Sequence, residues 1–170
     1  LYANVNLPRP VTWTFGVSVD DYEEPGLDQE GVSGKFGVRW NVTDNLRVRG
    51  AVFEAIKPAL AANQVLEPTQ VAGFNQLFDD IDGTKTRRYG GAIDWQAMTG
   101  VWTGLELSRR RFEEPVSTDA GVIFEARREQ LHRAYAAWTP VPELALSGEV
   151  IYDRYSTSGA IDVNKPTLVR

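Results

Sequence analysis

Cysteine is absent from this chain of 170 residues, which excludes a disulfide framework, a thiolate zinc site and a cysteine nucleophile. Long apolar runs are absent as well. None approaches the roughly 18 to 20 residues that a membrane-spanning helix needs, so a helical membrane protein is excluded. The net charge of −5 gives no electrostatic basis for binding nucleic acid. The mean hydropathy of −0.31 resembles that of a soluble protein, but it also allows a barrel wall, where only alternate residues of each strand face lipid.

The sequence does contain a repeated alternation of apolar and polar residues, which has the period of a β-strand. In the first clear strand, Trp13, Phe15 and Val17 share one face, and Thr12 and Thr14 share the other. Strands are predicted in this way over residues 11–19, 32–41, 46–56, 87–97, 101–112, 122–138 and 144–155, and a further strand begins after residue 164. Longer polar connections are predicted at residues 21–30, 57–86, 113–121 and 156–164. Short turns and long connections therefore alternate along the chain.

The tryptophans all lie beside the short turns. They are Trp13, Trp40, Trp95, Trp102 and Trp138. Tryptophan suits a membrane interface because its ring is apolar while its N–H group seeks water or lipid headgroups. Tyr22, Tyr89 and Tyr152 lie near the opposite, long-connection ends of their strands. The sequence therefore predicts two aromatic belts, one at each edge of an apolar band.

These patterns predict an all-β fold, an antiparallel up-and-down transmembrane β-barrel built as a meander of about seven to eight strands. We expect a single domain over residues 1–170, with one long outward loop at residues 57–86. Charged residues such as Arg49, Asp94 and Glu149 lie at mid-strand on the polar face. Burying them in a dry core would be costly, whereas a wet barrel lumen removes most of that cost.

The longest connection carries a motif. Asn63, Leu66 and Pro68 match, at the same spacing, an Asn-Pro-x-Leu-x-Pro-Glu pattern, with Glu67 inside it and Gln64 in place of the first Pro. This segment resembles the stretch that follows a barrel strand in TonB-dependent receptors. The whole chain is also similar to receptor-like outer-membrane barrels, some of them fused to tetratricopeptide repeats, that carry a similar Glu-Pro-Thr-Gln-Val-Ala-Gly-Phe-Asn-Gln loop.

The resemblance implies a porin-like or receptor-like wall segment in a Gram-negative outer membrane, with a transport role, no enzymatic activity and no cofactor. A plug or a periplasmic domain is an implied partner. Barrels of this kind end in Phe or Trp, whereas this sequence ends in Arg170, so we expect part of a larger barrel. Arginines such as Arg87, Arg109 and Arg111 gather near the long connections, where guanidinium groups could meet lipopolysaccharide phosphates or form an ordinary solvated rim.

Other candidate sites are weak. A short helix is predicted at residues 69–78, followed by a turn at Asp79, Asp80 and Asp82, whose spacing does not fit an EF-hand. The pairs Glu23–Glu24 and Glu113–Glu114 are adjacent in sequence at strand-to-loop junctions, and adjacent strand residues point to opposite faces. We therefore expect solvated loop acids rather than paired catalytic carboxylates. The single histidine, His132, is expected to be a rim or lumen residue. No catalytic, metal or cofactor site is predicted.

Two other functions fit the same pattern. A soluble eight-stranded lipocalin-like barrel would turn the apolar face into a dry ligand cavity and the charged face to water. A scaffold or export barrel could instead serve a periplasmic repeat domain. The segregation of tryptophan and of the short turns to one end favours a membrane wall over the soluble barrel.

Overall fold

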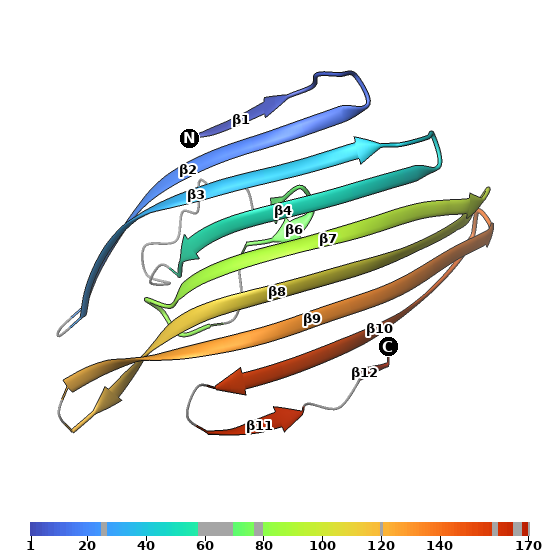
Figure 1. The fold of residues 1–170 in the computed structure, drawn as a ribbon. Helices are drawn as coiled ribbons and strands as arrows, with labels where there is room; N and C mark the ends of the chain where they lie inside the picture. Colours follow the sequence, from blue (N-terminus) through green and yellow to red (C-terminus); the bar gives the residue numbers. More distant parts are fainter. Residues whose placement is uncertain are drawn as a thin grey trace.

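The computed structural model describes residues 1–24, 27–57, 70–76, 80–119, 121–157, 160–164 and 168–169, with the side chains of residues 20–29 and 160–169 left out. The chain is all-β, with a ten-stranded antiparallel sheet (Figure 1). Its long strands, in spatial order, are β2 (Val11–Glu24), β3 (Leu27–Asn41), β4 (Leu46–Ile56), β7 (Lys85–Met98), β8 (Val101–Thr118), β9 (Gly121–Val141) and β10 (Leu144–Thr157). None of the described residues forms a helix long and apolar enough to cross a membrane.

The edges of the sheet are formed by short strands. β1 (Tyr2–Val5) pairs with β2 at one edge, and β11 (Ala160–Asn164) and β12 (Leu168–Val169) both pair with β10 at the other. No ladder joins the two edges within the described part of the chain, so the sheet is open. The predicted antiparallel meander is confirmed, because each predicted long strand is present and pairs with its neighbour along the chain.

Three of the predicted polar loops are wrong. In the connection predicted at residues 156–164, residues 156–157 belong to β10 and residues 160–164 form β11, which pairs with β10. Most of residues 21–30 lies in the paired strands β2 and β3, and residues 113–118 belong to β8, which pairs with β9 as far as the Thr118–Gly121 pair. The backbone ladder continues where the apolar alternation has ended. Ladder hydrogen bonds do not depend on side-chain type, so polar hairpins can extend beyond the part of the sheet that the apolar pattern marks.

The predicted helix at residues 69–78 is also wrong. This segment contains a small hairpin, β5 (Gln70–Val71) and β6 (Phe74–Asn75). Its turn residues Ala72 and Gly73 have φ angles of 48° and 88°, and positive φ at both central positions is the signature of a tight hairpin turn. A helix cannot continue through such a pair.

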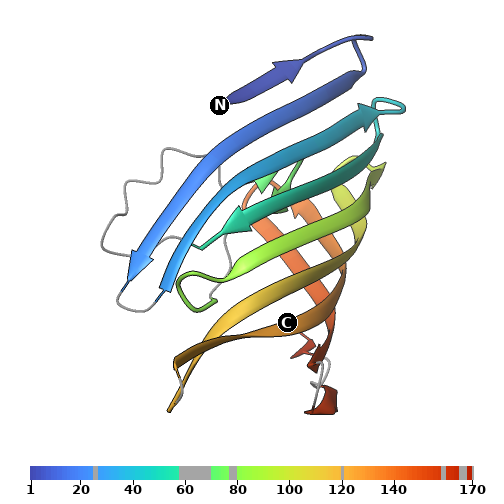
Figure 2. The same cartoon turned by 60° about the vertical axis from the view of Figure 1, so that its left-hand side comes forward.

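The sheet curves around the β5–β6 hairpin, which gives it a concave and a convex face (Figure 2). Register decides which residues share a face. Arg49, Ala92, Glu106 and Arg133 lie opposite one another across β4, β7, β8 and β9 on the concave side. The residues next to them, Gly50, Gly91, Leu107 and His132, form the corresponding row on the convex side. The polar face predicted from the alternation is therefore the inner one.

Candidate functional site on the concave face

The β5–β6 hairpin is seated in the concave face of the sheet rather than projecting outward. Val71 and Phe74 are fully buried there and form a core cluster with Ala51, Phe53 and Ala92. Two glycines make the close approach possible. A Cβ at Gly37 would lie 2.8 Å from Val71 Cγ1, and a Cβ at Gly90 would lie 2.7 Å from Phe74 Cε1. The described end of the connection at residues 57–86 thus occupies the space enclosed by the sheet.

Two arginines hold the hairpin in place. Arg49 Nη1 donates a hydrogen bond to the carbonyl oxygen of Ala72 (3.3 Å), and Arg88 Nη1 donates to the carbonyl oxygen of Asn75 (3.0 Å). Both guanidinium groups also face the ring of Phe74, at 5.4 Å for Arg49 and 5.8 Å for Arg88 from its centroid. The hairpin backbone and its one aromatic side chain are therefore bound by the same two cations.

Carboxylates on the neighbouring strands neutralise these arginines. Asp94 accepts two hydrogen bonds from Arg49, at 2.6 Å from Nε and 3.0 Å from Nη2, and a further one from the hydroxyl of Tyr135. Glu106 accepts a hydrogen bond from Arg88 at 3.2 Å and lies 3.9 Å from Arg49. The network joins β4, β7, β8 and β9, so it ties the curved sheet together as well as holding the hairpin.

A second ionic cluster lies toward the long-hairpin end of the same face. Arg110 donates to both carboxylate oxygens of Asp80, at 2.8 and 2.6 Å, and is also paired with Glu129. Nearby, Arg127 is paired with Glu114 and donates to the hydroxyl of Tyr155 at 2.7 Å. A cavity of about 320 Å³ lies between these groups. Asp80, which was predicted only as a turn residue, also binds Arg110 of β8 through its carboxylate.

The concave face thus combines buried ion pairs with the apolar cluster that the hairpin covers. Among the described residues, no group of three or more histidine, aspartate and glutamate side chains is placed to hold a metal ion. Glu113 and Glu114 point to opposite faces of β8, with Glu113 exposed. The expectation of a solvated loop acid is wrong for Glu114, which is a buried strand residue paired with Arg127. Such a surface can bind polar and charged groups, and the hairpin covers part of it.

The fit between Gly90 and Phe74 leads to a first prediction. We expect Gly90→Ala to lower the free energy of unfolding by about 1–3 kcal/mol, because the new methyl group would also lie 2.9 Å from Ser108 Cβ and 3.0 Å from the Leu107 carbonyl oxygen. Gly91→Ala is the matched control, since its Cβ would meet nothing closer than the Arg49 carbonyl oxygen at 3.8 Å. Urea unfolding of both variants in detergent micelles measures the difference. Equal losses would contradict the seating of the hairpin described above.

The convex face carries most of the predicted belt residues. Trp13, Trp40, Trp95 and Trp138 all lie on it, at the short-turn end of the sheet. Trp102 does not, because it lies opposite Gln96 and Ala137 on the concave side. Tyr89 and Tyr152 are exposed on the convex face, whereas the side chain of Tyr22 is outside the described residues.

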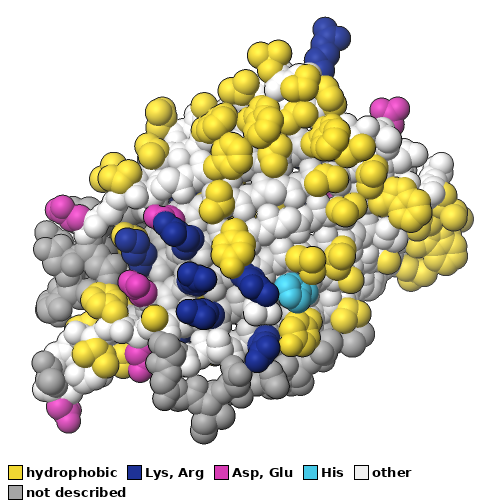
Figure 3. Space-filling model, viewed as in Figure 1, with side chains coloured by type: hydrophobic (Ala, Val, Ile, Leu, Met, Phe, Trp, Pro, Cys, Tyr) yellow, Lys and Arg dark blue, Asp and Glu magenta, His cyan; other side chains and the backbone are white. Residues whose placement is uncertain are grey.

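His132 also lies on the convex face, stacked on Tyr152 with ring centroids 5.9 Å apart. It therefore lies on the opposite face from the charged row of Arg49, Glu106 and Arg133. Figure 3 shows hydrophobic side chains spread over this face, and lysine and arginine gathered toward the end away from the short turns. The family-like motif residues Asn63, Leu66, Glu67 and Pro68 lie outside the described residues.

Sequence reasoning missed the buried arginines and the seating of the hairpin. One local signal was available, because Gly73, a residue type that accepts positive φ, directly precedes the large apolar residue Phe74. The fold that results is an open, curved antiparallel meander with a polar concave face and an apolar convex face. No protein-family model, no curated protein and no solved structure matches this chain.

Proposed function

We propose that this chain forms part of the wall of an outer-membrane β-barrel, with the convex face against lipid and the concave face lining a polar passage. The observation that carries the proposal is an inversion of ordinary burial. Ile93, Trp95 and Leu105 are 49%, 51% and 46% exposed, whereas Arg88 and Glu106 are 3% and 8% exposed. A water-soluble protein buries its large apolar side chains and keeps its charges outside.

The dimensions of the apolar face support this placement. On β2 the convex apolar residues run from Val11 to Val19, and on β10 they run from Leu144 to Tyr152. Eight residue steps at about 3.3 Å each span about 26 Å along a strand. Tilted by about 40°, such a strand rises about 20 Å, near the roughly 25 Å apolar band of outer-membrane barrels.

The curvature argues against the soluble calyx. A barrel that holds an apolar ligand needs an open apolar interior. Here the concave side carries the ion pairs of Arg49 and Arg88, and the hairpin itself covers the apolar cluster beside them. In a bilayer the open edges at β1 and at β11–β12 need hydrogen-bond partners. In our proposal, further strands of the same, larger barrel supply them.

A role in passage, as a pore or as a receptor, rests on the β5–β6 hairpin. It lies where a solute would travel, and it is bound to the wall by Arg49 and Arg88. A purely structural wall has no need of a folded segment in its lumen. Loops of this length are uncommon unless they serve a function.

Tryptophan fluorescence tests the proposal. We would refold the full chain into vesicles containing lipids brominated near the headgroups, using variants that keep Trp95 or Trp102 alone. Bromine is expected to quench Trp95 strongly and Trp102 weakly, because the ladders put them on opposite faces. A chain that stays folded and soluble without lipid, with neither residue quenched, would show that the membrane proposal is wrong.

A further inference from the structure

A row of arginines crosses the convex face toward its long-hairpin end. Arg111 on β8 lies directly opposite Arg87 on β7 and Arg128 on β9, and Arg109 lies on the same face two residues along β8. Side chains directly opposite each other in antiparallel strands have Cβ atoms about 4.5–5.5 Å apart, and like charges at this distance are destabilising. The row therefore has an electrostatic cost that calls for an anion.

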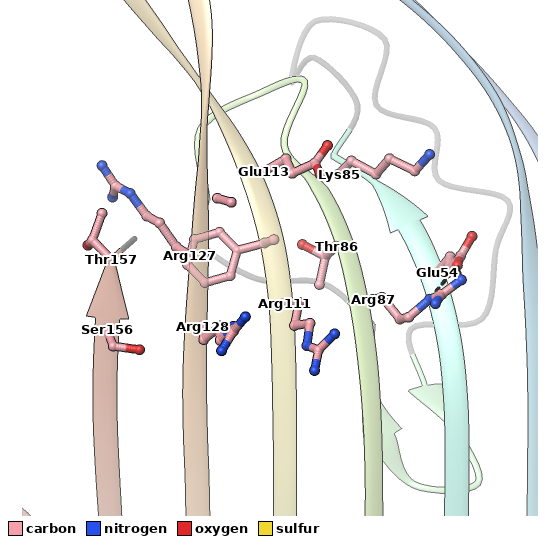
Figure 4. A pocket seen from close by; sticks show the side chains of 12 residues that line it. Glu54, Lys85, Thr86, Arg87, Arg111, Glu113, Arg127, Arg128, Ser156 and Thr157 are labelled. Carbon is pink, nitrogen blue, oxygen red and sulfur yellow. Dashed lines mark hydrogen bonds and ion pairs between the residues drawn. The ribbon is translucent and has the colours of Figure 1, made fainter. Parts of the chain in front are cut away.

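Carboxylates of the protein neutralise only part of the positive charge of this row. Arg87 is paired with Glu54. Glu113, the other acidic residue at this groove, lies opposite Lys85. For the remaining arginines, Arg109, Arg111 and Arg128, no acidic partner is found among the described residues. Two of these three, Arg111 and Arg128, line a groove of about 580 Å³, and Figure 4 shows them beside Arg87 on neighbouring strands.

We propose that this groove binds the phosphate of a membrane glycolipid, the lipid A portion of lipopolysaccharide. Guanidinium groups bind phosphate in bidentate fashion, and a phosphate between Arg111 and Arg128 would remove the repulsion within the row. The position of the row selects a lipid over a free phosphate. Leu107 directly precedes Arg109 on the convex face of β8, so acyl chains on the apolar band would end at the arginines.

This inference rests on the proposed function for its membrane placement, and binding measurements test it separately. The full chain, refolded in zwitterionic micelles, is titrated with diphosphoryl lipid A, with dephosphorylated lipid A and with inorganic phosphate. We expect the double variant R111Q/R128Q to bind diphosphoryl lipid A about tenfold or more weakly, because two charged hydrogen-bonding sites are lost. The variant R111K/R128K keeps the charge but not the bidentate geometry, and an intermediate loss is expected.

The variant R9Q/R39Q is the matched control. It removes the same charge from exposed arginines at the short-turn end, and it should bind as the unaltered chain does. Equal binding by R111Q/R128Q and by this control would overturn the inference. So would inorganic phosphate that binds as tightly as lipid A. Vesicle insertion by R111Q/R128Q distinguishes the two proposals. If the protein inserts into vesicles but its lipid binding does not depend on the arginines, only the lipid-site proposal is wrong. If lipid binding depends on the arginines but the protein does not insert, only the membrane-wall proposal is wrong.

Discussion

Replacing Phe74 with alanine is expected to detach the β5–β6 hairpin from the concave face and to lower the free energy of unfolding by about 3–5 kcal/mol. That is the usual cost of truncating a fully buried phenylalanine. Here the loss also removes the ring that Arg49 and Arg88 face, so both guanidinium groups lose a contact. Urea unfolding in micelles gives the stability, and limited proteolysis at residues 70–76 reports release of the hairpin.

The control for this prediction is Phe15→Ala, which deletes the same atoms from an exposed position on the convex face. It should leave the hairpin resistant to protease. Under the proposed function, Phe74→Ala should also raise the conductance of the complete barrel to which this wall belongs, because a freed hairpin no longer narrows the passage. A hairpin that stays protected in the Phe74 variant, with little change in stability, would contradict the seating described here.

Breaking the ion pair between Arg88 and Glu106 is expected to have a comparable effect. Arg88→Leu leaves a buried carboxylate without its closest cation, and Glu106→Leu leaves a buried guanidinium. Losing one partner of a buried pair costs about 3–5 kcal/mol. The double variant should be much less destabilised than the sum of the single variants, because both members of the ion pair are then absent. A double-mutant cycle on urea unfolding measures this coupling.

The pair Arg133 and Glu149 provides the comparison. It lies on the same concave face with an Nε–Oε2 distance of 2.8 Å, but the two side chains are 44% and 26% exposed. Exposed ion pairs contribute about 0–1 kcal/mol, so the corresponding cycle should show little coupling. Similar coupling in the two pairs would mean that water reaches Arg88 as freely as Arg133. The ion pair of Arg88 and Glu106 would then not be buried under the hairpin as the structure shows.

The sequence predicted the long strands because apolar residues recur at every second position in most of them, and this is the period of a strand. It could not predict how far β8 and β9 extend, since their outer halves carry no such constraint. The seating of Val71 and Phe74 depends on Gly37 and Gly90, which are distant in sequence and reach the hairpin only through the curvature of the sheet. The Asp80–Arg110 ion pair could not be predicted either, because it also joins residues that are distant in the sequence.

The side of Trp102 could have been read from the sequence. Val101, Thr103 and Leu105 share the apolar face, so the residue between the first two belongs to the other face. Proximity to a turn suggested a belt position, whereas parity along the strand decides orientation. The side of His132 follows from its pairing in the same way, because it lies opposite Leu107 on the apolar face, although its sequence neighbours include arginines.

The two ends of the sheet differ greatly in the number of polar and charged groups that would have to cross a bilayer during insertion. β9 runs for 21 residues, more than twice the length that the apolar band requires, and its excess lies with that of β8 in one charged hairpin. Among the described residues, the opposite end presents short connections, including the two-residue turns between β7 and β8 and between β9 and β10. Under the proposed membrane placement, unassisted entry would therefore lead with the tight turns, since few polar groups must shed water there. If the charged hairpin must instead end on the far side of the bilayer from the side of entry, we expect insertion to require an assembly factor that moves the hairpin across.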